Sequence, residues 1–260
     1  MTISDMSSLT ALVLAGNRPG GEPFADAQGV AHKGLIDVAG MPILARVCAA
    51  LRRAGIARIV IATNCEEVSV LARRLDCEVF PASAGPSDSV GAVLEEYGTP
   101  LLVTTADHAL LDARWITEFI RDTPDCDLSI LLARKEVVER DSPATKRTWM
   151  KLADGQWSGC NLFLLRTPDC RRAIGLWREV EANRKHPLRM AGRLGWGTLL
   201  RFILGQLTLQ QMVSRLAGQV DVDARVVAAH DGRAAVDVDK QSDLDLVRRL
   251  AAGKSTQAAA

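Results

Sequence analysis

Residues 11–21 read Ala-Leu-Val-Leu-Ala-Gly-Asn-Arg-Pro-Gly-Gly, a short apolar run followed at once by a glycine-rich turn. The apolar run has the length and composition of a buried strand, and glycines let main-chain N–H groups approach a ligand closely. In open sheets of parallel strands, such turns lie at the carboxyl edge, where ligands bind. The stretch therefore predicts the first strand of an α/β sheet and a ligand-binding loop at its end.

The same order of strand and helix patterns continues through the first half of the chain. Further short apolar runs occupy residues 58–62, 78–80, 101–104 and 128–132. Segments with apolar residues at helical spacing lie between them. This order indicates βαβ units and predicts a Rossmann-like α/β fold, with a mixed, mainly parallel sheet flanked by helices.

The second half of the chain departs from this regular order. Its predicted elements are, in chain order, a charged loop at 134–147, strands at 148–152 and 161–165, a mostly helical stretch at 168–217, strands at 222–228 and 234–238, and a helix at 242–250 with Ser242 as N-cap. We expect one domain over residues 1–252, in which 168–217 is a helical elaboration. Residues 253–260 are expected to form a disordered tail.

Composition excludes several classes of protein. Lysine plus arginine number 32 and aspartate plus glutamate 31, so no bulk positive field favours nucleic acid or an anionic membrane. No apolar stretch approaches the roughly 20 residues that span a bilayer, and no basic segment near Met1 precedes an apolar run. We therefore expect a cytoplasmic protein with no nucleic-acid partner and no integral membrane association, and the oligomeric state stays open.

The cysteines give no sign of a metal site. They form no Cys-x-x-Cys pair and no Cys/His cluster at zinc spacing. The six residues are Cys48, Cys65, Cys77, Cys126, Cys160 and Cys170. They are predicted to be reduced thiols in the core.

The glycine-rich turn carries groups that suit phosphate. Arg18 supplies a forked cationic donor inside the turn, and Lys33 stands at the far end of the loop. The turn matches neither the P-loop pattern nor the dinucleotide-binding pattern, so both of these hypotheses lose their main support. Taken alone, it is explained equally well as plain loop geometry.

Two linked motifs strengthen the hypothesis of a phosphate site. Leu-Ala-Gly-x-Arg-x-Gly-Gly at 14–21 is followed by Lys-Gly-Leu-x-x-Val-x-Gly-x-Pro-Ile-Leu at 33–44. The combination resembles the sugar-phosphate and molybdopterin-type (MobA-like) nucleotidyltransferases, whose Rossmann-like fold is shared with GT-A glycosyltransferases. The resemblance is close over residues 11–51 and holds in outline beyond them.

The resemblance implies that the loop wraps a nucleoside triphosphate, while Arg18 and Lys33 offset negative charge on the α-phosphate and the leaving pyrophosphate. It also implies that a serine at the start of a helix contacts the nucleobase. The implied nucleotide-binding residues are Leu14, Ala15, Gly16, Asn17, Arg18, Gly20, Gly21, Lys33 and Ser89. Two departures stand out: Asn17 replaces a common glycine, and the stretch 22–32 is longer than usual.

Asp107 follows the apolar run 101–104, where the fourth predicted strand leaves the sheet. In the family, the aspartate of an Asp-His-x-Leu-Leu-like motif binds Mg²⁺, and residues 107–111 match that motif. The resemblance therefore implies that Asp107 is a metal ligand and a catalytic residue, together with Arg18 and Lys33. The alternative is a helix cap, although Asp112 suits that role better.

A second acidic segment, Val-Asp-Val-Asp at 236–239, resembles the closing motif of these enzymes, with Lys-Gln in place of the usual Thr-Pro that follows. Alternation along a strand would place Asp237 and Asp239 on one face. Mg²⁺ takes one or two protein carboxylates plus phosphate oxygens. We therefore expect Asp107 and Asp239 as ligands and Asp237 as a further ligand or a neighbour. The alternative is an edge strand with two solvated acids.

The acceptor region is predicted from relatives to lie at 142–163. Lys146 and Arg147 would grip an acceptor phosphate, and Asn161 would bind its polar body. A solvated loop explains Lys146 equally well. The basic run 184–189, with Trp196 after it, is either an acceptor lid or a partner surface.

The resemblance implies a Mg²⁺-dependent nucleotidyltransferase that moves NMP from an NTP, CTP or GTP, to a small phosphorylated acceptor and releases pyrophosphate. No general base is needed because an acceptor phosphate is already ionised near neutral pH, so His108 is expected to be a neighbour rather than a catalyst. The alternatives are a nucleotide-sugar-dependent GT-A glycosyltransferase and a non-catalytic nucleotide-binding regulatory protein.

Overall fold

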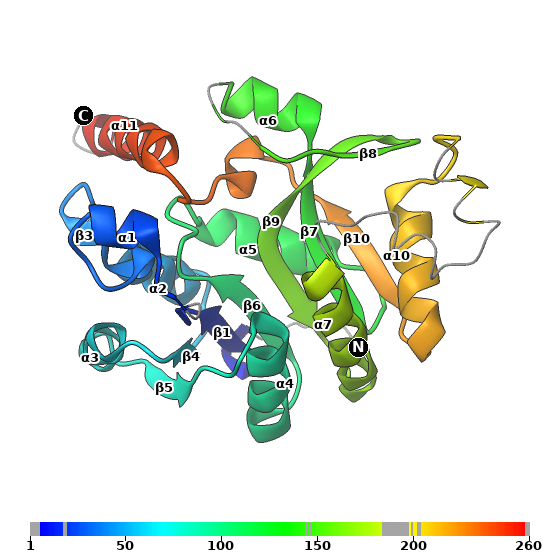
Figure 1. The fold of residues 1–260 in the computed structure, drawn as a ribbon, viewed down its shortest axis with the longest axis horizontal. Helices are drawn as coiled ribbons and strands as arrows, with labels where there is room; N and C mark the ends of the chain where they lie inside the picture. Colours follow the sequence, from blue (N-terminus) through cyan, green and yellow to red (C-terminus); the bar gives the residue numbers. More distant parts are fainter. Residues whose placement is uncertain are drawn as a thin grey trace.

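The computed structural model describes residues 6–17, 20–143, 145, 147–183, 198, 200–201 and 204–257. A twisted sheet of eight strands runs through it, in the order β10-β7-β9-β6-β1-β4-β5, with β8 paired to β9 (Figure 1). These strands are β1 (Thr10–Leu14), β4 (Arg58–Thr63), β5 (Glu78–Pro81), β6 (Leu101–Thr105), β7 (Leu128–Arg134), β8 (Met150–Leu152), β9 (Gly155–Leu165) and β10 (Ala224–Ala228). A two-stranded ribbon of β2 (Asp37–Val38) and β3 (Met41–Pro42) lies apart from it.

The sheet is mixed and mainly parallel, as predicted. Strand β1 pairs in parallel with β4 and β6, β4 with β5, and β7 with β10. Strand β9 is antiparallel to its neighbours β6, β7 and β8. Because β9 inserts between β6 and β7, the second half of the chain extends the sheet of the first half instead of forming a separate one.

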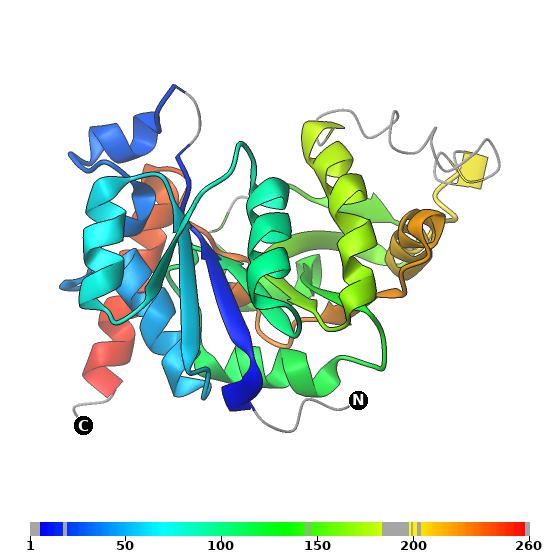
Figure 2. The ribbon, with the colours of Figure 1, turned by 90° about the horizontal axis from the view of Figure 1, so that it is seen from below.

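Helices cover both faces of the sheet (Figures 1 and 2). Alternate side chains of β1 point to opposite faces: Ala11 and Val13 pack on one side and Leu12 on the other. The first side is covered by α2 (Ile43–Arg53), α3 (Glu66–Arg74), α5 (Ala113–Asp122) and α11 (Gln241–Gln257). The second is covered by α4 (Pro86–Tyr97), α7 (Ala173–Asn183) and α10 (Leu209–Ala217). Burial on both faces explains why β1 is almost wholly apolar.

Three expectations about local structure were wrong. The charged segment 134–147 contains a helix, α6 (Lys135–Asp141), and is not a plain loop. Residues 234–238 do not form a strand, because the 3₁₀ turn η5 (Gly232–Ala235) is followed by an extended segment with no partner strand in the described residues. Ser242 does not precede the last helix, which begins at Gln241 and continues to Gln257, into the segment predicted to be a disordered tail.

The alternation in 234–238 has a different cause from strand pairing. Val236 and Val238 are both buried in the core, while Asp237 points to polar partners. An extended segment that lies over a core buries every second side chain whether or not another strand pairs with it. The pattern therefore predicted the local conformation and the burial correctly, and the pairing wrongly.

The carboxyl ends of β1 and β6 meet at one edge of the sheet. Leu14 lies opposite Thr105 in the parallel register, and the Ala106 N–H donates to the Leu14 carbonyl at 2.9 Å. The short helix α1 (Pro23–Ala27) and the 3₁₀ turn η2 (Lys33–Leu35) follow β1. The loop after β1 and the residues after β6 are thus neighbours because of backbone pairing alone.

Gly232→Ala should destabilise the protein strongly. A Cβ atom at position 232 would lie 2.3 Å from the Val137 carbonyl oxygen and 2.4 Å from the Val138 Cα, so η5 would have to move away from α6. We expect a loss of about 3 kcal/mol in the free energy of unfolding, measured by urea denaturation. Gly175→Ala in α7 is the matched control, because its Cβ would meet no atom within 4 Å. Equal stability of the two variants would contradict the packing of η5 on α6.

Candidate active site

A lysine joins two aspartates at the carboxyl edge of the sheet. Lys33 Nζ lies 2.8 Å from Asp107 Oδ2 and 2.7 Å from Asp239 Oδ1. The side chains of Lys33 and Asp107 are 14% and 16% exposed, whereas Asp239 is 62% exposed. The two carboxylate oxygens contact one nitrogen, so they cannot lie farther apart than the sum of those distances. Three predicted site residues from distant parts of the chain therefore converge.

Backbone hydrogen bonds hold these residues in place. The Val238 N–H donates to the Asp107 carbonyl at 3.1 Å, which joins the acidic segment to the end of β6. The Asp239 N–H donates to Asp243 Oδ2 at 3.3 Å, at the start of α11. On the lysine side, His32 Nδ1 accepts from the Gly34 N–H at 2.9 Å and caps the turn that carries Lys33. The convergence thus rests on local structure in each segment.

Asp107 is tied to the site rather than to a helix. Its Oδ1 accepts a hydrogen bond of 2.5 Å from the Thr105 hydroxyl. Asp112 is the residue that caps α5, through a hydrogen bond of 3.1 Å from the Arg114 N–H. The helix-cap alternative for Asp107 is therefore wrong.

Electrostatics keep Lys33 and Asp107 charged. Burial would raise the pKa of Asp107, but the Lys33 ammonium and the Thr105 hydroxyl outweigh it and lower that pKa. Burial would likewise lower the pKa of Lys33, but Asp107 and Asp239 outweigh it and raise that pKa. Near neutral pH Lys33 is therefore an ammonium and Asp107 a carboxylate.

His108 lies beside Asp107 and is buried. Burial lowers its pKa to about 4, although Asp107 and Asp237 oppose the shift, so the imidazole is neutral near pH 7. Its ring stacks on Trp115, with centroids 6.2 Å apart. A buried, neutral and weakly basic imidazole suits packing behind the site, as expected for a neighbour rather than a catalyst.

Asp237 belongs to a second ion-pair network. Both guanidinium Nη atoms of Arg147 donate to its carboxylate, Nη2 at 3.2 Å from Oδ2, and Asn161 Nδ2 donates to the same Oδ2 at 3.1 Å. Arg147 and Asp237 are each 13% exposed. Two predicted acceptor-binding residues thus hold Asp237. Asp237 pairs with Arg147 and Asp239 with Lys33, so the two acids of the segment have different cationic partners.

Asn161 reaches this network through an irregularity in β9. Its φ of 49° is left-handed, and the register of β9 on β7 shifts between Ile130 and Leu132, as at a β-bulge. A bulge redirects a side chain that regular alternation would point elsewhere. Sequence alternation alone does not predict this orientation.

The loop after β1 is fixed by a pair of asparagines. The Asn17 N–H donates to Asn64 Oδ1 at 2.8 Å, and Asn64 Nδ2 donates back to the Asn17 carbonyl at 3.3 Å. Asn17 Nδ2 also donates to the Ala31 carbonyl at 3.1 Å. The sequence analysis missed Asn64, although its position directly after β4, at the same sheet edge, was a signal. Asn17, the departure from the family motif, therefore orders the loop.

Other predicted residues fall into three groups. Leu14, Ala15 and Gly16 continue directly from β1, and Gly20 and Gly21 have φ of 95° and 84°, which favour glycine. Ser89 lies in the first turns of α4, where its hydroxyl accepts from the Ser83 N–H at 2.9 Å and donates to the Gly85 carbonyl at 3.1 Å. Three predictions lie outside the described residues: Arg18, Lys146 and the segment 184–189 with Trp196.

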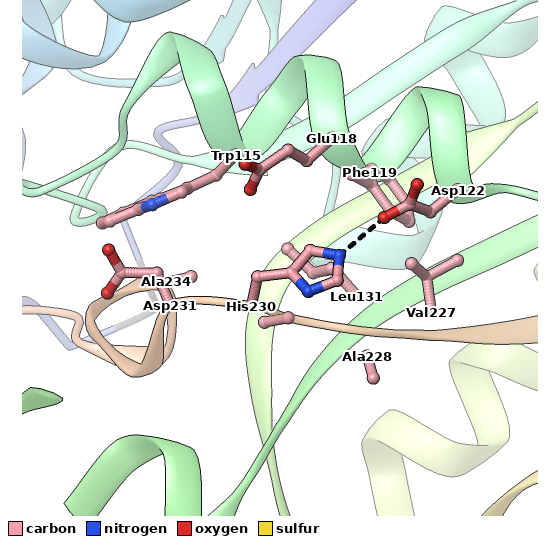
Figure 3. A pocket seen from close by; sticks show the side chains of 11 residues that line it. Trp115, Glu118, Phe119, Asp122, Leu131, Val227, Ala228, His230, Asp231 and Ala234 are labelled. Atoms are coloured by element: carbon pink, nitrogen blue, oxygen red, sulfur yellow. Dashed lines mark hydrogen bonds and ion pairs between the residues drawn. The ribbon is translucent and has the colours of Figure 1, made fainter. Parts of the chain in front are cut away.

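A shallow hollow lies between α5, the end of β10 and η5, and its space is about 230 Å³ when the part open to solvent is included (Figure 3). Trp115, Phe119 and Leu131 give it apolar walls, and a His230–Asp122 contact of 2.7 Å borders it. Its lining contains none of the predicted site residues. We therefore place the candidate site at the Lys33 cluster and not in this hollow.

The described residues contain no group of three or more His, Cys, Asp and Glu side chains that could hold a metal ion. Asp107 and Asp239, which share the Lys33 ammonium, are therefore a pair of carboxylates and, in the part of the chain that the structure describes, not part of a group of three such ligands. Within the same part of the chain, no helix combines the length and the apolar character that crossing a membrane requires.

Lys33→Met should cost about 3 kcal/mol of stability near pH 7, because it leaves Asp107 buried without its cation. In the wild type the lowered pKa of Asp107 stabilises the fold above the unfolded pKa of about 3.9, and this contribution is lost on acidification. In the variant, burial raises that pKa with the Thr105 hydroxyl but no longer the Lys33 ammonium to oppose it, so we expect acidification to relieve the buried charge. The difference between the two proteins should therefore shrink as the pH falls from about 7 towards 4.

Urea unfolding at several pH values measures this difference, with Lys240→Met, an exposed neighbour, as the control. A stability difference that is small at pH 7, or that grows on acidification, would contradict the buried ion pair.

The chain matches the family model of the MobA-like NTP transferase domain over residues 11–220. A solved structure of a hypothetical transferase from Thermus thermophilus is 33% identical, covers 90% of this chain and 98% of its own, and superposes with a TM-score of 0.77. No curated protein matches the chain.

Two more distant structures share the fold. A CMP:2-keto-3-deoxy-manno-octonic acid synthetase complexed with CTP is 15% identical, with a TM-score of 0.58 over 95% of this chain and 99% of its own. A nucleotidyl transferase from Methanothermobacter thermautotroptrophicus is 19% identical, with a TM-score of 0.57 over 95% and 98%. The family match spans most of the sheet and the loop that carries Lys33, and we conclude that the chain belongs to the MobA-like NTP transferase domain family.

Proposed function

We propose that this family member is a Mg²⁺-dependent nucleotidyltransferase that moves NMP from CTP or GTP to a small phosphorylated acceptor and releases pyrophosphate. The observation that carries the proposal is the convergence of Lys33, Asp107 and Asp239 beside the loop after β1. Nucleotidyl transfer needs positive charge where negative charge gathers on phosphate oxygens.

The acidic pair fits Mg²⁺. The Lys33 ammonium shows that a cation is accommodated between Asp107 and Asp239, with one oxygen of each carboxylate turned towards it. Mg²⁺ prefers hard oxygen ligands and takes one or two carboxylates plus substrate phosphates. Asp107 and Asp239 would hold the ion, which would supply charge neutralisation at the α-phosphate.

Lys33 has a second role in this proposal. In the structure its ammonium lies between the carboxylates, and a triphosphate carries more negative charge than either of them. Lys33 is then drawn towards the phosphate chain, where it stabilises the leaving pyrophosphate, and the two aspartates are released for the metal ion. Arg18 and the N–H groups of Gly20 and Gly21 would complete the phosphate contacts.

In the transfer step an acceptor phosphate oxygen forms a bond to the α-phosphorus, and the bond from that phosphorus to the pyrophosphate oxygen breaks. No proton has to be removed from an ionised phosphate, which agrees with a buried, neutral His108. Arg147 would orient the acceptor phosphate together with Lys146, while Asn161 would contact the body of the acceptor. We propose that Asp237 is a positioning residue that holds Arg147 ready, because its oxygens already accept from Arg147 and Asn161.

The nucleobase is expected near the start of α4. Ser89 lies there, and its contacts with Ser83 and Gly85 fix the preceding turn. Main-chain groups of that turn would then face the base, with Ser89 setting their orientation. The structural relative that contains CTP supports CTP as one of the two candidates.

Pyrophosphate release measured with each NTP, Mg²⁺ and a panel of phosphorylated acceptors tests the function. We expect release only when both substrates are present, and we expect Asp107→Asn or Asp239→Asn to lower turnover by about a hundredfold or more. The double variant should lose little further activity, because the two residues act as a unit. Asp245→Asn, an exposed acid on α11, is the control and should leave turnover unchanged.

Other outcomes would overturn the proposal. Transfer of a sugar from a nucleotide sugar would favour a glycosyltransferase, and NTP binding without turnover would favour a regulatory protein. Near-wild-type turnover in both single aspartate variants would remove the assignment of the acidic pair.

A further inference from the structure

Far from the active site, two cysteine thiols lie in contact. Cys77 Sγ is 3.8 Å from Cys48 Sγ, although 29 positions separate the two residues. Cys48 lies in the middle of α2, and Cys77 directly precedes β5. All six cysteines are buried free thiols, as predicted, and within the described residues this is the one recorded contact between two of them. The pair therefore differs from the other four cysteines in its chemistry.

An arginine lies beside one thiol of the pair. Arg52, one helical turn after Cys48, places Nη2 4.0 Å from Cys77 Sγ. The same Nη2 donates to the carbonyl oxygens of Leu75 and Asp76 at 2.8 and 2.7 Å, which hold the guanidinium near the sulfur. A fixed cation next to a thiol favours the thiolate, which is the form that reacts with oxidants.

The two thiols are unequal. The contact with Cys48 lowers the pKa of Cys77, and the Arg52 charge lowers it further, although burial opposes both effects. The contact with Cys77 and burial raise the pKa of Cys48. Cys77 is thus the more nucleophilic member and Cys48 the one that stays protonated. This division matches that of an attacking and a resolving cysteine.

The geometry permits a covalent bond between the two sulfurs. The sulfur atoms must approach each other by about 1.8 Å to reach the disulfide length of about 2.05 Å. Hydrogen bonds hold the backbone at both cysteines: Cys48 is inside a helix, and the Cys77 N–H donates to the Ala72 carbonyl at 3.0 Å. Cys77 is 7% exposed and Cys48 2%, so a small oxidant reaches Cys77 first.

We propose that Cys48 and Cys77 form an oxidisable dithiol that a hydroperoxide converts to an intramolecular disulfide. The Cys77 thiolate attacks the peroxide, whose O–O bond breaks, so that Cys77 becomes a sulfenic acid and the other oxygen leaves as water or alcohol after taking up a proton. The Cys48 sulfur then displaces the sulfenic oxygen as a second water. In total the two thiols lose two protons and two electrons, and the peroxide takes them up to give two water molecules, or one water and one alcohol.

The position of Cys48 and Cys77 predicts how a disulfide between them would affect the protein. Cys77 lies at the amino end of β5, whereas Lys33 and Asp107 lie at the carboxyl edge of the sheet. The disulfide would tie α2 to the turn between α3 and β5 and would restrict the unfolded chain. We therefore expect it to raise thermal stability and to leave the Lys33 cluster unaltered. This inference does not depend on the proposed function.

The test treats the native full-length protein with hydrogen peroxide, blocks free thiols with N-ethylmaleimide after unfolding, and maps the peptides by mass spectrometry. We expect one cross-linked peptide pair joining Cys48 to Cys77, four alkylated cysteines, a melting temperature raised by several degrees, and reversal by dithiothreitol. Cys48→Ala and Cys77→Ala should each abolish the cross-link. Cys170→Ala, which removes a buried thiol elsewhere, is the control and should retain it.

Two further measurements test the dithiol if a cysteine variant folds poorly. With both cysteines kept, Arg52→Met should slow disulfide formation severalfold, because the Cys77 thiolate is less favoured without the arginine charge. In Cys48→Ala, dimedone should trap a sulfenic acid at Cys77. Six alkylated cysteines after peroxide treatment, a cross-link between other cysteines, or oxidation of Cys77 to the sulfonic acid in wild-type protein without a cross-link would each overturn it.

Discussion

An ammonium group held between two carboxylates is the interaction on which the candidate active site depends. Lys33 is brought there by a loop after β1, Asp107 by the end of β6, and Asp239 by a segment bonded to the Asp107 backbone. Without the lysine, two carboxylates would face each other at a partly buried sheet edge, where like charges are costly. The proposed function requires this ammonium to give way to a metal ion when a triphosphate binds.

Hydrogen bonds also hold other side chains of the candidate site in place. Asp237, which accepts a hydrogen bond from Asn161, orients Arg147, and the Asn17–Asn64 pair fixes the loop after β1. Charged groups that are already in position lose less entropy and need less reorganisation when phosphate binds. The fold supplies this order at low cost, because parallel strands end at a common edge.

Much of this could be predicted from the sequence. Apolar runs that alternate with helical patterns predicted the parallel strands, and the ends of those strands predicted that the loop after β1 and Asp107 would leave the sheet at its carboxyl edge. The position of Asp239 followed from a motif and not from geometry. Strand pairing and side-chain partners could not be predicted in the same way. The alternation at 234–238 indicates the burial of Val236 and Val238, but it does not indicate whether another strand pairs with the segment. The bulge that turns Asn161 towards Asp237 leaves no periodic pattern in the sequence.

Binding of Mn²⁺, followed by the electron paramagnetic resonance of the free ion, tests most directly whether Lys33 holds the place of the metal. In the wild type we predict weak binding that tightens at least about tenfold when a non-hydrolysable NTP analogue is added, since the nucleotide draws Lys33 away. Lys33→Met should bind Mn²⁺ tightly without nucleotide, and Lys33→Met with Asp107→Asn should not. Equal affinity of wild type and Lys33→Met for Mn²⁺ in the absence of nucleotide would contradict the account.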